Sequence, residues 1–433
     1  MRRLSLIFVC AAGIAHAQPP ATDPPAPPLV APTDPEPASV PPVVAPPPVP
    51  PESDKTPDVL PARSDPAAPS AEVLPISPAH ENHPPYPPME IGVDGFLQTQ
   101  FRMRQDSPAQ FDENGFRFNR ARFIVHGKTH VGEVELTARI EAELQPIVDM
   151  VDAFVTATHK LPNDGQLSVD LGQMRVPLSR QQLLSESRLA FVDRAQIATI
   201  VPRRDLGARI GLVVPKLPQV QLVGGVFNGE GTNQVQNINQ KFLYAGRLEV
   251  TPLGKEKQFG ESSFGGDFLT AAVSVGLNKL TAGTRSEDIT YLGFDLSGAY
   301  KGLSGTIEYL VVDHAFTETG PMTVQDYRGN GFVAQLSYML PVELPPLSQG
   351  RIEVGVRIEE IDRNDTVPIG QVGEPEQSVR ESTGVLSLYL RKHSLKAQLA
   401  FSHFQEIETE TSAGENAVYD NDQLLLQVTC RLE

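Results

Sequence analysis

The sequence has no tryptophan, two cysteines among 433 residues, and few aromatic side chains. It also has no run of about 18 apolar residues, so a helical membrane protein is excluded, because a membrane-spanning helix needs about 20. Lys and Arg number 36 against 53 Asp and Glu, which gives a formal net charge of −17. A chain with so few basic residues is a poor candidate for binding nucleic acid.

Proline is abundant in one part of the chain and scarce in the rest. Residues 19–88 contain 26 of the 40 prolines. The other residues there are mostly Ala, Val, Ser and Asp, a composition typical of a disordered, partly polyproline II spacer. We therefore predict a proline-rich disordered tail at 18–88 and one folding unit at 89–433. We interpret the tail as a periplasmic tether, and an arm that contacts the cell wall is the alternative.

The first seventeen residues indicate a signal peptide for export. Arg2 and Arg3 form a charged start, residues 4–14 are mostly apolar, and Ala15-His16-Ala17 has the small-x-small pattern of a cleavage site. Cleavage after Ala17 would remove Cys10 and leave Cys430, so no disulfide is expected within the mature chain.

From Met89 onward, polar and apolar residues alternate. In residues 133–144, Glu, Thr and Arg alternate strictly with Val, Leu, Ala and Ile. This period-two pattern places the two kinds of side chain on opposite faces of a strand. Twelve residues at about 3.3 Å each span about 40 Å, which suits a strand that crosses a bilayer at a tilt.

Sixteen strands are predicted, and an even number is what a closed antiparallel barrel in an outer membrane needs. Short connections such as 301–302 and 216–219 alternate with long ones such as 175–207. Two connections break this rule: 251–267 is long at the short-turn end, and 145–147 is short at the long-loop end. The predicted strands begin near Ile91, Phe116, Glu133, Asp149, Gln166, Ala208, Val220, Phe242, Phe268, Thr290, Leu303, Gly331, Arg351, Thr383, Leu395 and Asp422.

The cost of placing charge in lipid predicts which face of the barrel points outward. An ionised side chain at the bilayer midplane costs up to a few kcal/mol, so the charged faces of the strands are expected to point into the lumen. A lumen lined with charge is expected to hold water, which indicates a pore. The alternative is a soluble propeller or sandwich, which period-two alternation does not exclude. The long charged alternations and the absence of a blade repeat favour the barrel.

Several blocks of the sequence, in this order, resemble the phosphate-selective porin O and P family of Gram-negative outer membranes. The blocks are residues 118–123, 172–207, 227–254 and 420–424. The resemblance covers about residues 90–433. It implies a sixteen-stranded barrel, usually a homotrimer, that passes small anions such as phosphate. It also implies that the third long loop folds into the channel.

On this chain the third long loop is 175–207, and it carries more cations than anions. Guanidinium groups offer forked donors to oxyanions and raise an electrostatic barrier to cations. The alternative is that these arginines pair with acids, such as Arg194 with Asp193 and Arg204 with Asp205, and hold the shape of the loop. The candidate residues for lining the pore and selecting anions are Arg120, Arg122, Arg139, Arg175, Arg188, Arg194, Arg203 and Arg204.

No catalytic or metal-binding pattern stands out in the sequence. His126 and His130 are four residues apart, which suits a metal on a helix, but they fall at a predicted strand end. We therefore predict no enzyme, no cofactor and no metal site. The predicted function is a passive channel for small anions in the outer membrane of a Gram-negative bacterium. The alternative is a non-conducting structural or adhesive barrel that its tail tethers to the cell wall.

Overall fold

The computed structural model describes residues 89–104, 114–145, 147–254, 261–262, 264, 266–282, 285–318, 325–342, 350–365, 378–406 and 421–432. The predicted signal peptide (1–17) and the predicted proline-rich tail (18–88) lie outside these residues. Within the described ranges, no helix has the length and apolar character needed to cross a membrane.

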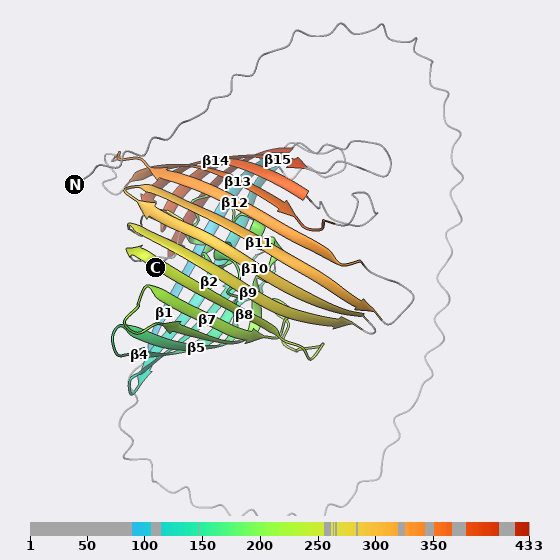
Figure 1. The fold of residues 1–433 in the computed structure, drawn as a ribbon. Helices are drawn as coiled ribbons and strands as arrows, with labels where there is room; N and C mark the ends of the chain where they lie inside the picture. Colours follow the sequence, from blue (N-terminus) through green and yellow to red (C-terminus); the bar gives the residue numbers. More distant parts are fainter. Residues whose placement is uncertain are drawn as a thin grey trace, which may run out of the picture. The chain divides into compact units, whose positions relative to one another are not determined.

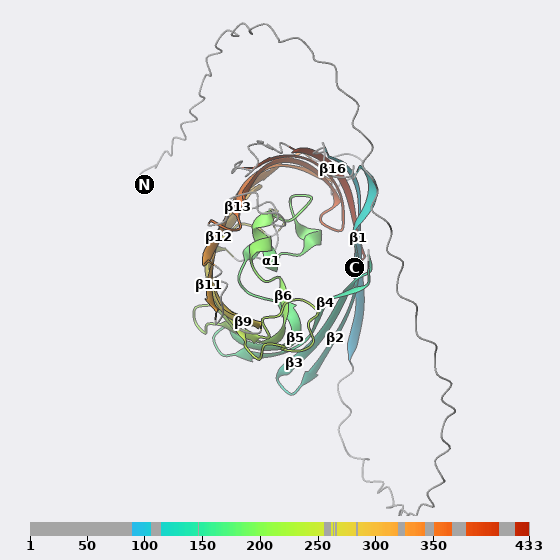
Figure 2. The same cartoon turned by 90° about the vertical axis from the view of Figure 1, so that its right-hand side faces the viewer.

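The described residues form sixteen antiparallel strands that close into a barrel, as Figures 1 and 2 show. The first strand, β1 (Glu90–Arg104), pairs with the last, β16 (Asn421–Leu432). Closure removes the free sheet edges, whose unpaired backbone groups lipid could not satisfy. The other strands are β2 (Gly115–Val131), β3 (Val134–Glu143), β4 (Asp149–Leu161), β5 (Gly165–Arg175), β6 (Arg204–Val213), β7 (Val220–Phe227), β8 (Leu243–Gly254), β9 (Phe268–Ala282), β10 (Arg285–Tyr300), β11 (Leu303–Glu318), β12 (Tyr327–Met339), β13 (Arg351–Asp362), β14 (Ser378–Arg391) and β15 (Leu395–Glu406).

The prediction of a sixteen-stranded antiparallel barrel is confirmed, and most strands begin within two residues of the predicted position. Four strands begin four or five residues earlier than predicted, and in each case the added residues lie at the long-loop end. Polar and apolar residues do not alternate regularly in these added residues, although the hydrogen-bond ladder continues through them. These strands are β6, β10, β12 and β14.

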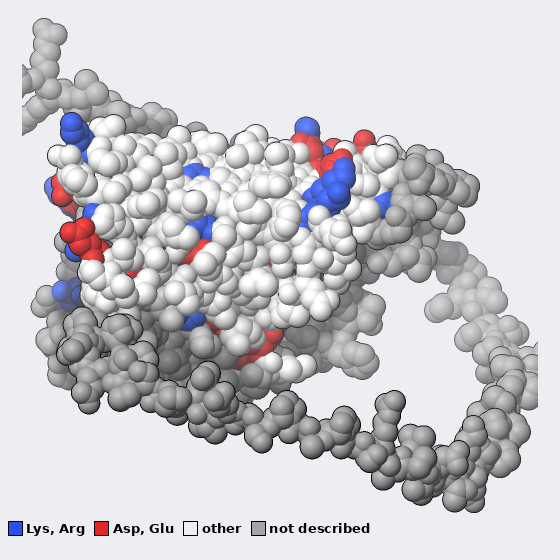
Figure 3. Space-filling view, turned by 90° about the horizontal axis from the view of Figure 1, so that it is seen from below, with Lys and Arg blue, Asp and Glu red and all other residues white. Residues whose placement is uncertain are grey.

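The two faces of the strands alternate as predicted. In β13, Glu353 and Glu359 are buried inside the barrel, while Val354 and Val356 are exposed on its outer surface. Figure 3 shows that the side of the outer wall in view is mostly uncharged and that its largest groups of charged residues lie toward the two ends. This distribution fits a wall whose middle band contacts the hydrocarbon of a bilayer.

The third long loop, residues 176–203, connects β5 to β6 and runs inside the barrel, as the resemblance implied (Figure 2). We call it the inner loop. It contains the short helices α1 (Arg180–Leu183), η1 (Glu186–Arg188) and η2 (Gln196–Ile200). Its side chains Leu178 and Ile197 belong to one buried apolar cluster with Leu310 of the barrel wall. Apolar packing therefore attaches the loop to the wall at the side of β11.

Polar side chains of the wall form hydrogen bonds with backbone groups of the inner loop. Buried backbone donors and acceptors need partners, and the loop has little secondary structure to supply them. Bonds of this kind hold the loop at several points along its length. They join Glu308 to the N–H groups of Arg180 (2.9 Å) and Gln181 (3.0 Å), Lys396 to the carbonyl of Leu189 (2.6 Å), Gln398 to the carbonyl of Ala190 (2.8 Å), and Arg357 to the carbonyl of Asp193 (2.8 Å).

The connection between β8 and β9 explains why residues 251–267 break the short-turn rule. Its buried residue Glu261 lies inside the barrel and contacts the inner loop. Glu261 accepts hydrogen bonds from Nε2 of Gln181 (2.8 Å), from the N–H of Ala190 (3.0 Å), and from Nε2 of Gln335 on β12 (2.7 Å). The connection is long because it extends into the lumen and supports the inner loop from the short-turn end.

Replacing Glu261 with alanine tests this support. The Glu261→Ala variant leaves three buried donors without their acceptor, and each unpaired donor costs about 1–3 kcal/mol. We expect the free energy of unfolding in detergent to fall by about 3 kcal/mol or more. The matched control is Glu133→Ala in the exposed turn after β2, which should unfold as the wild type does. Equal stability of both variants would show that the connection does not hold the loop.

Candidate functional site

Glu186, in η1 of the inner loop, lies at the centre of a group of arginines. The nearest nitrogens of four arginines lie 2.9 Å (Arg122), 3.0 Å (Arg194), 3.0 Å (Arg203) and 3.8 Å (Arg175) from its carboxylate oxygens, counted among the described residues. The side chain of Glu186 is 1% exposed. We call these five residues the Glu186 cluster.

Further ion pairs extend the Glu186 cluster along the wall of β2, β3 and β4. Guanidinium groups outnumber carboxylates in this region, so the described part of it carries a net positive charge. The additional pairs are Arg122 with Glu141 (2.7 Å) and Glu143 (2.9 Å), Arg139 with Glu141 (2.6 Å), Arg204 with Asp152 (2.6 Å), and Arg120 with Asp193 (3.7 Å).

The arginines keep the carboxylate of Glu186 ionised. Burial would raise the pKa of Glu186, but the charges of Arg194, Arg122 and Arg175 outweigh burial and hold this pKa well below its usual range. In the same cluster, burial lowers the pKa of Arg203 to about 10, although Glu186 acts in the opposite direction. Both groups are therefore charged at neutral pH. Removing one partner of such a buried set costs about 3–5 kcal/mol.

The arginines differ in how much of the side chain reaches water. Arg203 is 49% exposed and Arg139 is 36% exposed, whereas Arg122 and Arg204 are each 2% exposed. Arg203 and Arg139 can therefore contact a solute in the lumen. Arg122 and Arg204 are buried against carboxylates and hold the structure together.

The structure brings seven of the eight predicted arginines into this region. The charge of the eighth, Arg188, acts on His393, whose pKa is lowered by burial and by nearby cations that include Arg188. The pairs considered from sequence neighbours are wrong, because Arg194 pairs with Glu186 and Arg204 pairs with Asp152. The seven are Arg120, Arg122, Arg139, Arg175, Arg194, Arg203 and Arg204.

Sequence reasoning missed the central position of Glu186. The sequence holds one indication of this role: Glu186 is an acidic residue that lies between two basic residues of the loop, Arg180 and Arg188. It also missed Glu261, which lies in a connection that had been noted for its length. Neither role follows from periodicity, because both residues act through contacts made after a loop folds into the lumen.

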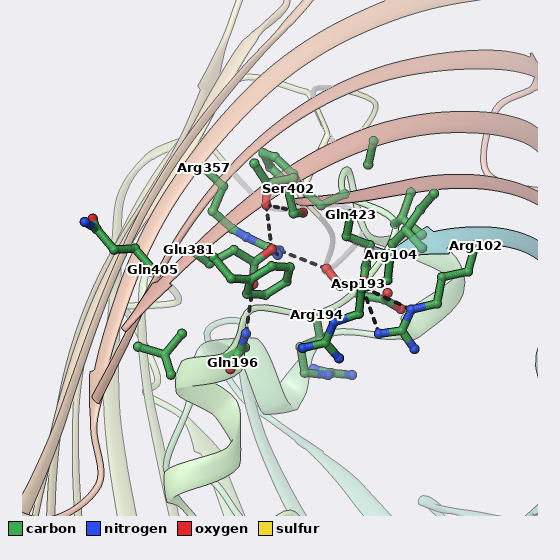
Figure 4. A pocket seen from close by; sticks show the side chains of 17 residues that line it. Arg102, Arg104, Asp193, Arg194, Gln196, Arg357, Glu381, Ser402, Gln405 and Gln423 are labelled. Carbon is green, nitrogen blue, oxygen red and sulfur yellow. Dashed lines mark hydrogen bonds and ion pairs between the residues drawn. The ribbon is translucent and has the colours of Figure 1, made fainter. Parts of the chain in front are cut away.

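Two hollows lie on either side of the Glu186 cluster. The smaller one, of about 300 Å³, faces the long-loop end, and Figure 4 shows Arg102, Arg104 and Arg194 around it. The larger one, of about 1330 Å³, extends from Arg175 and the inner loop to the short turns between β4 and β5 and between β6 and β7. Because Arg194 lines one hollow and Arg175 lines the other, the cluster lies between them.

Toward the short turns, the lumen beside β13 to β15 is filled by side chains. Tyr389 and Glu353 are each 0% exposed, and the Tyr389 hydroxyl donates to Glu353 over 2.5 Å. Phe264, from the β8–β9 connection, packs edge-on against the ring of Tyr389 with centroids 5.0 Å apart. The larger hollow is lined instead by residues of β3 to β8 and the inner loop. The open part of the lumen toward the short turns therefore follows β3 to β8.

Comparisons with known proteins agree with this architecture. The sequence model of a family described as phosphate-selective porin O and P matches residues 91–428. A sequence search of curated proteins finds no match.

Solved structures with a similar fold include three outer-membrane proteins at low sequence identity. An anion-selective porin from Comamonas acidovorans has a TM-score of 0.56 and 11% identity, with 80% of this chain and 100% of that chain covered. The outer membrane channel DcaP of Acinetobacter baumannii has a TM-score of 0.51 and 13% identity, with 79% and 97% covered. The trimer form of OmpT of Vibrio cholerae has a TM-score of 0.50 and 11% identity, with 79% and 99% covered.

A variant that removes one charge tests the role of Glu186. In Glu186→Gln the four arginines face a neutral amide and repel one another, so we expect the inner loop to detach from its site. Trypsin should then cleave the folded barrel after arginines of the inner loop, and the free energy of unfolding should fall by about 3 kcal/mol or more.

The matched control is Glu135→Gln, which removes a lumen carboxylate that is 32% exposed and pairs with Lys128 at 2.7 Å. Exposed ion pairs contribute little to stability, so this variant should resist trypsin. Resistance of Glu186→Gln to trypsin would show that the cluster does not hold the loop.

Proposed function

The chain belongs to the phosphate-selective porin O and P family, and we propose that it lets small anions diffuse across the outer membrane past the Glu186 cluster. The family match and the closed barrel support an outer-membrane channel. The anion preference is our proposal. The observation that carries it is the excess of guanidinium groups between the two hollows, with Arg203 and Arg139 reaching water.

Local charge, rather than the charge of the whole chain, supports anion passage. Residues 89–433 carry a net charge of −12. At physiological salt, however, exposed charges are screened over about 8 Å. A solute between the two hollows is therefore affected mainly by the arginines beside it. A narrow passage with low-dielectric walls and positive charge attracts anions and repels cations.

Several finer features remain part of the proposal. The similar porin from Comamonas acidovorans carries the description anion-selective, which supports the same preference here. We propose that phosphate is among the anions that pass, in line with the family description. We also propose that the channel assembles as a trimer, because one of the structures with a similar fold is the trimer form of OmpT of Vibrio cholerae. Residues 1–17 would direct export, and the tail at 18–88 would lie in the periplasm.

Ion selectivity in planar bilayers tests the proposed function. Wild-type channels in a potassium chloride gradient should give a reversal potential whose sign shows that chloride permeates more readily than potassium. Arg139→Ala combined with Arg203→Ala removes the two most exposed positive charges of this region, and we expect the ratio of anion to cation permeability to fall at least about twofold.

The control for this pair is Arg380→Ala, at a residue that is 47% exposed and pairs with Glu360 over 2.8 Å on the outer face of the barrel. This control should keep the wild-type reversal potential. A wild-type protein that prefers cations, or that conducts no current, would contradict the proposed function.

A further inference from the structure

Two glutamates face each other on neighbouring strands near the long-loop end of the lumen. Glu359 on β13 stands directly opposite Glu381 on β14, and the two are 1% and 5% exposed. Their carboxyl groups lie within hydrogen-bond reach of each other. We call Glu359 and Glu381 the carboxyl pair. Like charges directly opposite each other destabilise a sheet, so this placement needs a compensating contact.

The carboxyl pair shares a single arginine. Nη2 of Arg357 lies 3.2 Å from Glu359 and 3.3 Å from Glu381, and no other cation among the described residues pairs with either acid. On the flanking strands, the residues opposite the pair are Val333 of β12 and Phe404 of β15, and both are uncharged. If both carboxylates were ionised, one buried negative charge would therefore lack a partner, which is strongly destabilising.

Charged groups of the other nearby segments do not offset this excess. Glu261 of the β8–β9 connection and Asp193 of the inner loop also act on Arg357, and both are acids. The helix η2, which packs against the carboxyl pair, contains no charged residue. The cations that line the smaller hollow beside the pair form no ion pair with it, and they are Arg102, Arg104 and Arg194.

The carboxyl pair attaches η2 to the wall of the barrel. The N–H of Gln196 donates to Glu359 over 2.5 Å, and Nε2 of Gln196 donates to Glu381 over 3.0 Å. Figure 4 shows the second of these bonds, with Arg357 at the other side of Glu381. Oε1 of Glu359 is buried and accepts no hydrogen bond within the described part of the chain. A proton on this carboxyl group would let Glu359 donate to Glu381 and would leave both bonds to Gln196 in place.

We propose that Glu359 and Glu381 share one proton, and that the protonated carboxyl pair is a pH-sensitive latch that keeps η2 attached to the wall. At neutral pH the proton bridges the two carboxyl groups, and Arg357 balances the one negative charge that remains. At alkaline pH the proton passes to solvent, the two carboxylates repel each other, and η2 is released. Attachment that depends on a bound proton is complete at low pH and is lost as the pH rises. Because Gln196 lines the smaller hollow, this release changes the passage at the long-loop end.

Trypsin cleavage of the full-length protein in detergent, between about pH 7 and about pH 9, tests the latch. The rate of cleavage after Arg194 and Arg203, which flank η2, is followed by mass spectrometry. Glu359→Gln keeps an oxygen for the N–H of Gln196 and supplies an amide donor to Glu381 at every pH. Other buried acids also titrate, so the deciding quantity is the wild-type rate divided by the rate of this variant at the same pH. This ratio should rise with pH, by up to about tenfold for each unit once the proton is lost.

The control is Glu360→Gln, the same exchange at the next residue of β13, whose side chain is 45% exposed on the outer face and pairs with Arg380. Its cleavage rate should follow that of the wild type at every pH. Glu381→Gln changes the carboxyl pair from the other strand and should give the same rising ratio, so the test stands if one of the two variants does not fold. A ratio to either folded variant that stays constant across this pH range would overturn the inference. The proposed function does not enter this result, because cleavage does not depend on which ions pass.

Discussion

The structure depends on a buried carboxylate surrounded by guanidinium groups. Glu186 is almost fully buried in the lumen with Arg122, Arg175, Arg194 and Arg203 around it. Removing either the carboxylate or the guanidinium groups would leave a buried charge without a partner, which is strongly destabilising. The arginines of the wall and of the inner loop thus share one counterion. Their mutual arrangement fixes where the loop lies.

This arrangement also determines where the lumen stays open. Toward the short turns, the inner loop, Glu261 and Phe264 fill the side of β13 to β15, where Tyr389 and Glu353 are buried. The hollow along β3 to β8 remains open, and Arg139, which reaches water, lines it. A barrel whose chain is acidic overall can therefore present a positive passage. The relevant quantity is the charge within a screening length of the passage, not the sum over the sequence.

Periodicity was sufficient to predict the barrel, because lipid on one side and water on the other impose alternation on every strand. Residues 133–144 carry that signal at full strength, and the structure has β3 there. Strand ends such as Arg285 and Ser378 were missed, since polar and apolar residues do not alternate regularly there although the pairing of the strands continues. The bounds of the inner loop were predicted from the pattern of strands and connections, whereas its position inside the channel was implied by the resemblance to a family.

The candidate site was predicted in its residue types and not in its contacts. Charge counting in the loop identified the arginines, but it could not distinguish Arg203, which reaches water, from Arg204, which is buried against Asp152. Nor could it identify Glu186 as the shared counterion, or Glu261 as a support from a different connection. These roles arise when segments far apart in the sequence meet inside the barrel, and local spacing carries no information about such meetings.

Anomalous scattering from crystals soaked separately in bromide and in rubidium would test the central claim most directly, because it locates anions and cations inside the lumen. The account predicts bromide peaks beside Arg203 and beside Arg139, which lines the hollow along β3 to β8, and no rubidium at either position. Rubidium at those positions, or bromide confined to the outer ends of the barrel, would contradict it.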